Sequence, residues 1–565
     1  SEAGGAPSRK PAGGGRAGGR SAASLKSKRD AEAKYFWEQV ELRNGGRPGN
    51  SKRLEFASSR REAKLFGPEE LWAGASGLAA AAAADATRRS SSSSSAYDDI
   101  PVDVDSGPVG EYEPLSEFSE LLGTVDDAIL LNCARCGYTR PTPIQRHAVP
   151  LAQCGRRDLL ASAQTGSGKT AAFLLPMISH ALRVLVPDEP RGAEPARGEA
   201  VVEGRNNSSR RKTPCAPLCL ILAPTRELAA QISEEAERLS WGTEVRTTCV
   251  HGGSSAMPQL KDLARGPAIL VATPGRLMDF VESGYVSLSK VRHLVLDEAD
   301  RMLDMGFEPQ IQKLLEKSNM PQPSSGRQTS LFSATFPDGV ERLVERYTRS
   351  SLARVAVGRV GSTVGGIEQR LVLARADMTH KLELLWEALD TVEGQTIIFT
   401  SRKASAAWYR RGLLYGDSVG VEEIHGDRSQ AQREVSLERF RSGESRVLVA
   451  TDVAARGIDI SGVAHVINAD LPEIPSDFDS YVHRIGRTGR AGRTGIATSL
   501  YVPGREGNAD LHGLLSRLLH ENEQEIPEWF QQLPEAKAGA GAPSGYEASY
   551  GSGRGWGGAG AGSKA

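Results

Sequence analysis

The chain has 565 residues, of which 39% are hydrophobic and 25% charged, a composition that suits two to three globular domains with disordered flanks. No stretch approaches the roughly 20 apolar residues of a membrane span, which excludes a helical membrane protein. The formal net charge is -1, yet residues 1–96 contain 17 Lys/Arg against 10 Asp/Glu. A basic arm attached to a more acidic body indicates a polyanionic partner rather than a membrane.

Residues 1–96 are of low complexity, with an alanine run at 79–84 and a serine run at 90–95. Such a composition cannot bury enough apolar surface to offset the entropy lost on ordering, so this arm is predicted to be disordered. Two aromatic islands within it, Tyr35-Phe36-Trp37 and Lys64-Leu65-Phe66, are candidates for docking on a folded domain. Residues 535–565, rich in Gly, Ala and Ser, form a second tail that is predicted to be disordered.

Two α/β cores are predicted between the tails, because apolar strand-like runs alternate with helical patterns. The first core spans residues 97–357, and its clearest strands are predicted at 218–223, 268–272, 291–296 and 329–332. A segment rich in Pro, Arg, Glu and Gly at 186–217 is interpreted as a surface insertion within it. After a glycine-rich hinge at 358–366, the second core spans 367–534, with strands predicted at 396–400, 447–450, 463–468 and 495–500.

A phosphate-binding loop follows the apolar run at 159–161 and precedes a helical pattern. Its glycines allow backbone N–H groups to surround phosphates, and the next helix directs its N-terminal dipole at them. Lys169 is predicted to contact the β- and γ-phosphates, and Thr170 to help hold magnesium. The predicted nucleotide-binding residues of this loop are Gln164, Thr165, Gly166, Ser167, Gly168, Lys169 and Thr170.

An acidic run, Asp297-Glu298-Ala299-Asp300, follows the predicted strand at 291–296. Alone it is weak evidence, but in the same core as a phosphate loop it predicts chemistry at a strand end. Asp297 would hold magnesium, and Glu298 would orient or deprotonate the attacking water. The chain is therefore predicted to bind and hydrolyse a nucleoside triphosphate.

The second core contains the basic run Tyr481-Val-His483-Arg484-Ile-Gly486-Arg487-Thr-Gly489-Arg490. Its spacing predicts that Arg487 and Arg490 lie one helical turn apart, on one side. Guanidinium groups brought onto a γ-phosphate from a second domain would stabilise transition-state charge as arginine fingers. Hydrolysis would then depend on closure of the two domains.

These motifs, with others in the same order, resemble those of the DEAD-box ATP-dependent RNA helicases over roughly residues 97–532. The further matches are Gly137-Tyr138-Thr-Arg-Pro-Thr-Pro-Ile-Gln145, Pro224-Thr225-Arg226-Glu-Leu228, Gly252-Gly253, Thr273-Pro274-Gly275-Arg276, Ser333-Ala-Thr335, Gln430-x-x-Arg433 and Ala450-Thr451-Asp452 through Asp459. Segments at 97–102, 356–362 and 525–530 are similar to the Ded/Vasa-like branch. The resemblance implies two RecA-like domains in tandem.

The resemblance also implies roles for individual residues. Tyr138 and Gln145 would bind adenine, and Gly457 and Asp459 would bind the nucleotide from the second domain. Phe118 departs from the family pattern, because it stands about two residues further upstream than the family's adenine-stacking aromatic. Asp300, Ser333, Thr335, His483 and Arg484 would couple the domains, with His483 and Arg484 approaching Asp300. The residues implied to contact RNA are Pro224, Thr225, Arg226, Gly252, Gly253, Thr273, Pro274, Gly275, Arg276, Gln430, Arg433 and Thr451.

The resulting hypothesis is an RNA-dependent ATPase that uses ATP and Mg²⁺ to unwind short RNA duplexes non-processively or to remodel RNA–protein complexes. Contacts to the backbone and 2′-OH predict a preference for RNA over DNA with little sequence preference. The branch implies a role in translation initiation with initiation factors as partners, and a cytoplasmic location with nuclear shuttling. A monomer, or weak self-association through the tails, is expected.

Two alternatives stay open. An ATP-gated RNA clamp or scaffold would share every motif, with hydrolysis serving only for release. Alternatively, the Arg/Gly/aromatic tails would be the main functional unit, through condensation or additional grip on RNA.

Overall fold

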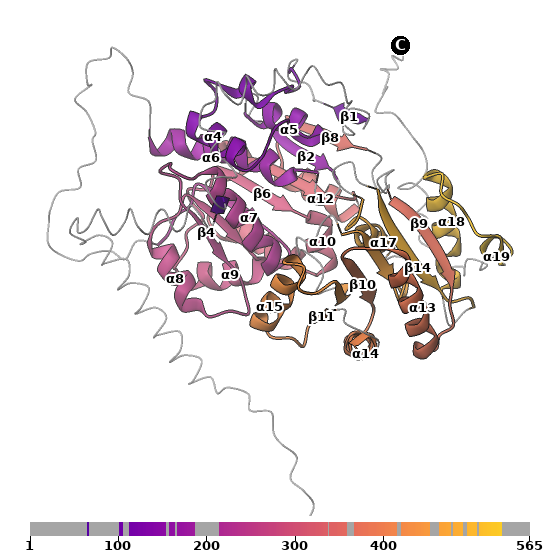
Figure 1. Ribbon diagram of the computed structural model, residues 1–565. Coiled ribbons are helices and arrows are strands. Elements are labelled where there is room, and N and C mark those ends of the chain that lie inside the picture. The colour runs from indigo at the N-terminus through magenta and orange to yellow at the C-terminus, as the bar shows by residue number, and fades with distance from the viewer. Residues whose placement is uncertain are drawn as a thin grey trace, which may run out of the picture.

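The computed structural model describes most of the chain between residues 101 and 533. The described residues are 65–66, 101–105, 112–153, 157–163, 167–186, 214–336, 338–358, 367–414, 420–452, 463–475, 478–489, 494–504 and 508–533. Figure 1 shows two α/β domains in tandem, each with a central sheet and helices packed against it, as predicted. Both predicted tails, the hinge and the insertion lie outside the described residues except for a few positions at their margins and the pair Leu65 and Phe66.

The first sheet has eight strands within the described residues. They are β1 (Val102–Asp105), β2 (Asp158–Ser162), β3 (Cys219–Leu222), β4 (Thr247–Val250), β5 (Ile269–Ala272), β6 (His293–Asp297), β7 (Gln328–Ser333) and β8 (Leu352–Val357). Their order is β1-β8-β2-β7-β6-β3-β5-β4, with β1 antiparallel to β8 and the other neighbours parallel. The four strands predicted for this core are present.

Helices cover both faces of this sheet. They are α4 (Asp127–Arg135), α5 (Pro143–Gln153), α6 (Lys169–Leu185), α7 (Arg226–Leu239), α8 (Ala256–Ala264), α9 (Pro274–Glu282), α10 (Ala299–Asp304), α11 (Glu308–Lys317) and α12 (Asp338–Tyr347). Successive side chains of a strand point to opposite faces, so Cys219 and Ile221 of β3 join the apolar cluster under α5, α6 and α7. Leu220 and Leu222 join the other cluster, under α8, α9 and α11. Burial on both faces explains why β3 is a continuous apolar run.

The second sheet has six strands within the described residues. They are β9 (Ile367–Leu373), β10 (Thr396–Thr400), β11 (Val421–Ile424), β12 (Val447–Thr451), β13 (His465–Asn468) and β14 (Gly495–Tyr501). All neighbours are parallel, in the order β11-β12-β10-β13-β14-β9. Its helices are α13 (Met378–Thr391), α14 (Lys403–Leu414), α15 (Gln430–Arg441), α17 (Phe478–Ile485), α18 (His512–Glu521) and α19 (Glu528–Gln531). The four strands predicted here are also present.

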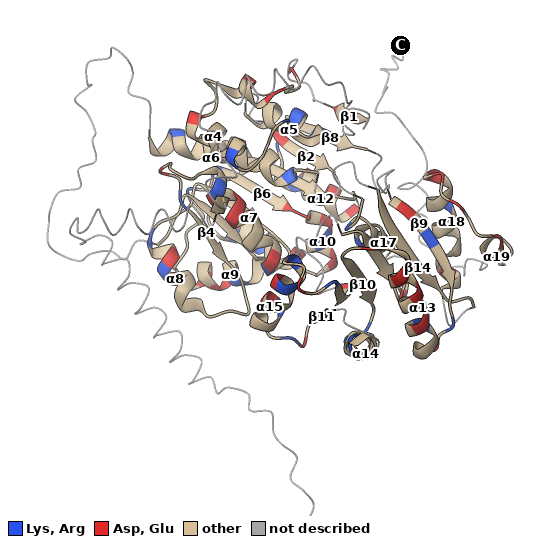
Figure 2. Cartoon of the chain, in the orientation of Figure 1, with Lys and Arg blue, Asp and Glu red and all other residues tan. Residues whose placement is uncertain are grey.

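The parallel arrangement brings the predicted site residues of the first domain to one edge of its sheet. Asp297 and Ser333 are the last residues of β6 and β7, while Thr225 and Thr273 follow β3 and β5 closely. In open parallel sheets, ligands bind outside the carboxyl ends of the strands. Figure 2 shows acidic residues at the end of β6 and on α10, on the side of the first domain that meets α17.

The island Lys64-Leu65-Phe66 docks on the first domain through its two described residues. Leu65 is buried, and the ring of Phe66 makes an edge contact with Trp241, at 6.4 Å between centroids. The Arg135 guanidinium lies 5.6 Å from the Phe66 ring centre, in a cation–π contact. Part of the arm is therefore attached to the ends of α4 and α7.

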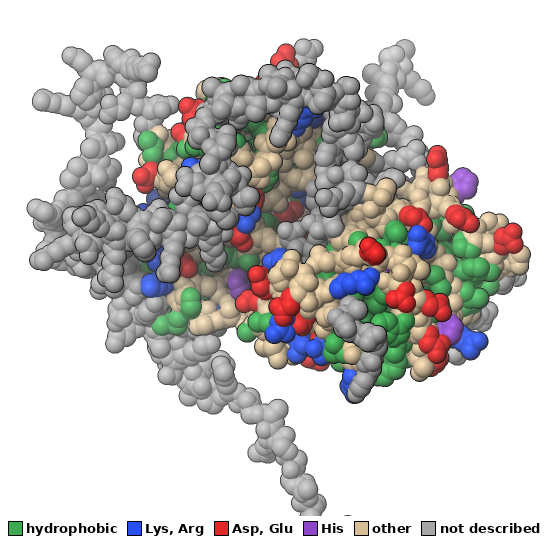
Figure 3. All heavy atoms as spheres, viewed as in Figure 1, with side chains coloured by type: hydrophobic (Ala, Val, Ile, Leu, Met, Phe, Trp, Pro, Cys, Tyr) green, Lys and Arg blue, Asp and Glu red, His purple; other side chains and the backbone are tan. Residues whose placement is uncertain are grey.

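The visible surface of the second domain has interspersed basic and acidic side chains (Figure 3). Among the described residues, no helix is both long and apolar enough to cross a bilayer. Because basic and acidic side chains are interspersed on the visible face of the second domain, recognition of a polyanion there would depend on individual positioned residues rather than on a uniform basic surface.

Candidate nucleotide and RNA site

Gln145 joins the segment predicted to bind adenine to the phosphate loop. It is 3% exposed, and its Oε1 accepts a hydrogen bond from the Thr142 backbone N–H at 3.0 Å. Its Nε2 donates to the Gly168 carbonyl at 3.0 Å. Gly168 has a φ of +91°, and a Cβ there would lie 2.5 Å from Gln145 Nε2, so the contact requires glycine. The two predicted nucleotide-binding segments are therefore in direct contact.

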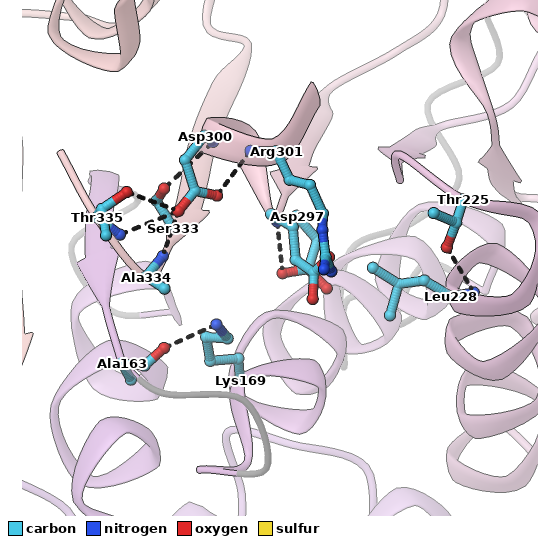
Figure 4. A network of polar contacts seen from close by, with 11 residues as sticks. Ala163, Lys169, Thr225, Leu228, Asp297, Asp300, Arg301, Ser333, Ala334 and Thr335 are labelled. Carbon is cyan, nitrogen blue, oxygen red and sulfur yellow. Dashed lines mark hydrogen bonds and ion pairs between the residues drawn. The ribbon is translucent and has the colours of Figure 1, made fainter. Parts of the chain in front are cut away.

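Lys169 and Asp297 lie around a common space at the edge of the first sheet (Figure 4). Lys169 begins α6 and donates from Nζ to the Ala163 carbonyl at 2.7 Å. Asp297 is 3% exposed, and burial raises the pKa of its carboxyl to about 7 although the Lys169 charge opposes this. The carboxylate of Asp297 and the hydroxyl of half-buried Thr170 are hard oxygen donors. They fit a magnesium ion, which would offset the cost of burying the Asp297 charge.

Glu298 is held by an arginine one turn later on α10. Its backbone is left-handed, with a φ of 53°, a conformation that is uncommon for a residue with a side chain. Arg301 Nη1 donates to Glu298 Oε2 at 2.5 Å, and the two side chains are only 5% and 8% exposed. Burial alone would raise the pKa of Glu298, but Arg301, Arg487 and Lys169 together lower it to about 2. Glu298 is therefore ionised.

Asp300 connects the acidic run to the segment Ser333-Ala334-Thr335 at the end of β7 (Figure 4). Its Oδ2 accepts from the Ala334 N–H, the Thr335 N–H and the Thr335 hydroxyl, at 3.1, 3.0 and 3.0 Å. Its own N–H donates to Ser333 Oγ at 3.3 Å. Three of the five residues predicted to couple the domains are thus bonded to one another inside the first domain.

Two residues of the second domain face this network. Half-buried His483 lies on α17. Burial lowers its pKa to about 4, an effect that Arg301 and Arg487 reinforce and that Asp300 and Glu298 oppose. Arg487 is 6% exposed and contributes to the lowered pKa of Glu298. The predicted approach of His483 to Asp300, and of Arg487 to the predicted hydrolytic residue, agrees with this arrangement.

Arg484, in contrast, does not take the predicted place beside Asp300. Its Nε donates to Asp452 Oδ1 at 2.6 Å, its Nη2 binds the other oxygen of that carboxylate, and its Nη1 donates to the Asp470 carbonyl at 2.5 Å. The guanidinium also lies 5.5 Å from the Phe399 ring centre. The side chain is buried within its own domain, where it ties α17 to the ends of β12 and β13.

The prediction that Arg487 and Arg490 lie one helical turn apart is wrong in its premise. Helix α17 ends at Ile485, and the following residues form a turn. Thr488 is not helical: its hydroxyl donates to the Val463 carbonyl, and its backbone forms an isolated β-bridge with Val463. Arg487 is therefore presented from a turn, and Arg490 lies outside the described residues.

Two of the residues predicted to contact RNA are in close contact at the end of β4. A Cβ added to Gly253, whose φ is +75°, would lie 1.7 Å from Arg226 Nη1, so the guanidinium lies directly over this glycine. Thr225 caps α7 by accepting the Leu228 N–H at 3.3 Å. Two further predicted residues lie near the end of β5. Thr273 precedes α9, and Arg276, in the first turn of α9, donates to the Ser254 carbonyl at 3.2 Å.

Arg433 of the second domain is bonded to the first. Its Nη2 lies 2.9 Å from Glu227 Oε1, and the side chains are 13% and 9% exposed. Glu227 belongs to the predicted RNA-contacting segment of α7, whereas Gln430 and Arg433 lie on α15. Thr451, the other residue of this domain predicted to contact RNA, is buried and is the last residue of β12. Arg433 thus has a role as an interdomain ion-pair partner that the sequence did not indicate.

Tyr138 is placed by its neighbours in the first domain. Its hydroxyl donates to Glu235 on α7, and its ring stacks on Phe118 with 6.2 Å between centroids. Phe118, the aromatic that stands too far upstream, is buried in the same cluster. Both rings therefore pack in the apolar cluster that lies under α5, α6 and α7.

Comparison with known proteins places the chain in a family. Residues 142–343 match the DEAD/DEAH box helicase family, and residues 380–492 match the helicase conserved C-terminal domain. The RNA helicase Prp28 from Chaetomium thermophilum bound to ADP is 33% identical, with 76% of this chain and 94% of that chain covered and a TM-score of 0.37. S. cerevisiae Dbp5 bound to RNA and ADP BeF3 is 29% identical, with 73% and 95% covered and a TM-score of 0.56. The chain belongs to the DEAD-box helicase family.

Membership confirms the two RecA-like domains and makes the chain an ATP-dependent RNA helicase. Several of the residues expected to serve this DEAD-box helicase fall outside the described residues: Gln164, Thr165, Gly166, Gly457, Asp459 and Arg490. Their roles stay predictions.

Two polar residues of this helicase's site were not predicted from the sequence. Arg301 pairs with Glu298 and Glu227 pairs with Arg433. Arg301 could have been found, because a spacing of three residues places opposite charges together on a helix that begins after Glu298. The pairing of Glu227 with Arg433 depends on how the two domains meet, for which the sequence contains no local signal.

Proposed function

We propose that this protein is an RNA-dependent ATPase that unwinds short RNA duplexes non-processively or remodels RNA–protein complexes. One observation supports this most: Asp300 of the acidic run bonds to Thr335, while His483 and Arg487 of the second domain lie against the same network. Anything that moves the domains relative to each other therefore alters the surroundings of Glu298.

ATP and Mg²⁺ are the proposed ligands of the first domain. Gln145, Lys169 and Thr170 would bind the nucleotide, and Asp297 with Thr170 would hold the ion, whose charge would stabilise the phosphates. Glu298 would orient the attacking water, and Arg487 would stabilise charge that develops during phosphoryl transfer. The Prp28 relative is described as bound to ADP, and the Dbp5 relative to ADP BeF3.

Single-stranded RNA is the proposed second ligand, and the Dbp5 relative is described as bound to RNA. It would lie across both domains, along Arg226, Gly253 and Arg276 on one side and Arg433 on the other. Gly253 leaves room for the Arg226 guanidinium, which would contact the sugar-phosphate chain. Contacts to this backbone and to the 2′-OH would favour RNA over DNA with little sequence preference. ATP and RNA would each favour domain closure, which makes their binding reciprocal.

We propose that this activity serves messenger RNA translation initiation, in the cytoplasm with nuclear shuttling. This proposal rests on the resemblance of the segments at 97–102, 356–362 and 525–530 to the Ded/Vasa-like branch. Initiation factors would be its protein partners. The test is translation of reporter messages in a cell-free extract depleted of the protein. Messages with a structured leader should be restored by adding the protein back, whereas equal behaviour of structured and unstructured leaders would contradict this placement.

The biochemical proposal is tested by ATP turnover of the full chain with no nucleic acid, with single-stranded RNA and with DNA of matched sequence. Stimulation by RNA alone is expected, and equal rates in all three would contradict coupling. Strand release from short and long duplexes then separates the two candidate activities. Release from short duplexes only supports the non-processive helicase, whereas ATP-dependent retention of RNA without strand release supports the clamp.

A further inference from the structure

The direction of the Glu298 carboxylate is set by two features of the first domain. The residue has a left-handed backbone, with a φ of 53°, at the start of α10. A residue with a side chain is strained in this region, and the conformation persists only where the surroundings impose it. The side chain is also buried, 8% exposed, so a partner is needed for its charge.

Arg301 is that partner within the first domain. Its guanidinium, 5% exposed, binds Glu298 Oε2 by a single nitrogen, Nη1. This contact holds the carboxylate through Oε2, and Oε1 does not take part in the bond to Arg301. Lys169 also lies near Glu298, but its ammonium is directed to the Ala163 carbonyl. The Arg301 backbone N–H donates to Asp300 Oδ1 at 2.9 Å, so the same residue also touches the segment that binds Thr335.

The second domain brings one cation, Arg487, close to this carboxylate. His483 lies there too, but burial and the neighbouring Arg301 and Arg487 lower its pKa to about 4, so its imidazole is uncharged near neutral pH. Arg301 is therefore close both to the predicted hydrolytic residue and to His483 of the second domain. Like charges on Arg301 and Arg487 compete for one carboxylate.

We infer that Arg301 is a positioning residue for hydrolysis, which holds the Glu298 carboxylate in its direction while the domains approach. This rests on the proposed function, since it assigns a task to the same site. Arg301 does not need to contact the nucleotide. Its loss should leave ATP affinity nearly intact and slow turnover, because a misdirected carboxylate no longer orients water.

The experiment compares Arg301→Met, which removes the charge at similar volume, with Arg301→Lys, which keeps it. In the RNA-stimulated ATPase we expect Arg301→Met to lower kcat by about 10- to 100-fold, with KM for ATP and the affinity for a fluorescent ATP analogue within about twofold. Arg301→Lys should recover part of kcat. A matched control is Arg349→Met, because Arg349 pairs with buried Asp158 at 2.8 Å in the same domain. It should lower thermal stability without selectively lowering kcat.

A double variant distinguishes positioning from a general structural effect. If Arg301 acts through Glu298, adding Arg301→Met to Glu298→Gln should cause almost no further loss of turnover. An equal, additive loss in both backgrounds, or an unchanged kcat in Arg301→Met, would overturn the inference. A wild-type chain that shows no stimulation by RNA would instead overturn the proposed function, so the two failures can be told apart.

Discussion

The two domains build their sides of the site in different ways. In the first domain the site residues are bonded to one another: Gln145 to Gly168, Lys169 to Ala163 and Asp300 to Thr335. In the second domain Arg484 of the arginine motif is bonded inward, to Asp452. Its neighbours His483 and Arg487 face the first domain instead. The first domain thus has a site already ordered for a ligand, while the second supplies one arginine and one uncharged histidine whose position depends on domain contact.

The largest expected effect is on turnover, and it tests this division from both sides. Glu298→Gln in the first domain and Arg487→Gln in the second should each lower RNA-stimulated kcat by about 100-fold or more, since each removes a group proposed to act on phosphoryl transfer. Binding of a fluorescent ATP analogue should be retained in both. Near-normal hydrolysis in either variant would remove that residue from the proposed chemistry.

Arg484→Met should instead destabilise the second domain. The guanidinium is 3% exposed and its loss leaves Asp452, 23% exposed, without its main cation, which predicts a loss of about 2–3 kcal/mol in the free energy of unfolding. Denaturant unfolding followed by circular dichroism measures it. The control is Arg439→Met, whose side chain is 49% exposed and pairs with Glu422 and Glu444. It should have a much smaller effect on the free energy of unfolding, because ion pairs of exposed side chains contribute little, and equal effects of the two changes would contradict an internal role for Arg484.

Arg484 and Arg487 also show what sequence can and cannot predict. Strand ends were predictable, because an apolar run followed by polar residues defines where β6 ends, and Asp297 stands there. A basic run gives no such information: Arg484 and Arg487 are of the same type, but one points inward. Arg484 lies on α17 and points into its own domain, whereas Arg487 lies on the turn after Ile485, where Thr488 binds Val463, and faces the first domain. Tertiary contacts of this kind have no local pattern.

A pH effect is expected in the second domain from His465, at the start of β13. Burial, reinforced by Arg370 and Arg446, lowers its pKa to about 4 from 6.5. Between these values the unfolded chain binds more protons than the folded one, so stability falls as pH decreases from 6.5 toward 4, by at most about 1.4 kcal/mol per pH unit for this group. His465→Gln should reduce that slope in unfolding measurements. The exposed His520→Gln is the control, and an unchanged slope in His465→Gln would show that other groups cause the acid sensitivity.

The smallest expected effect concerns the ion pair that joins the domains directly. The resemblance implied that Arg433 contacts RNA, whereas here it pairs with Glu227 at 2.9 Å. If the pair stabilises closure, Arg433→Glu and Glu227→Arg should each weaken RNA-stimulated turnover about 5- to 10-fold, an effect of about 1–1.4 kcal/mol. Combining them restores opposite charges in reversed order. Recovery of at least half of the lost stimulation would assign Arg433 to closure, while no recovery would assign it to RNA, because only an RNA contact requires the positive charge at position 433 itself.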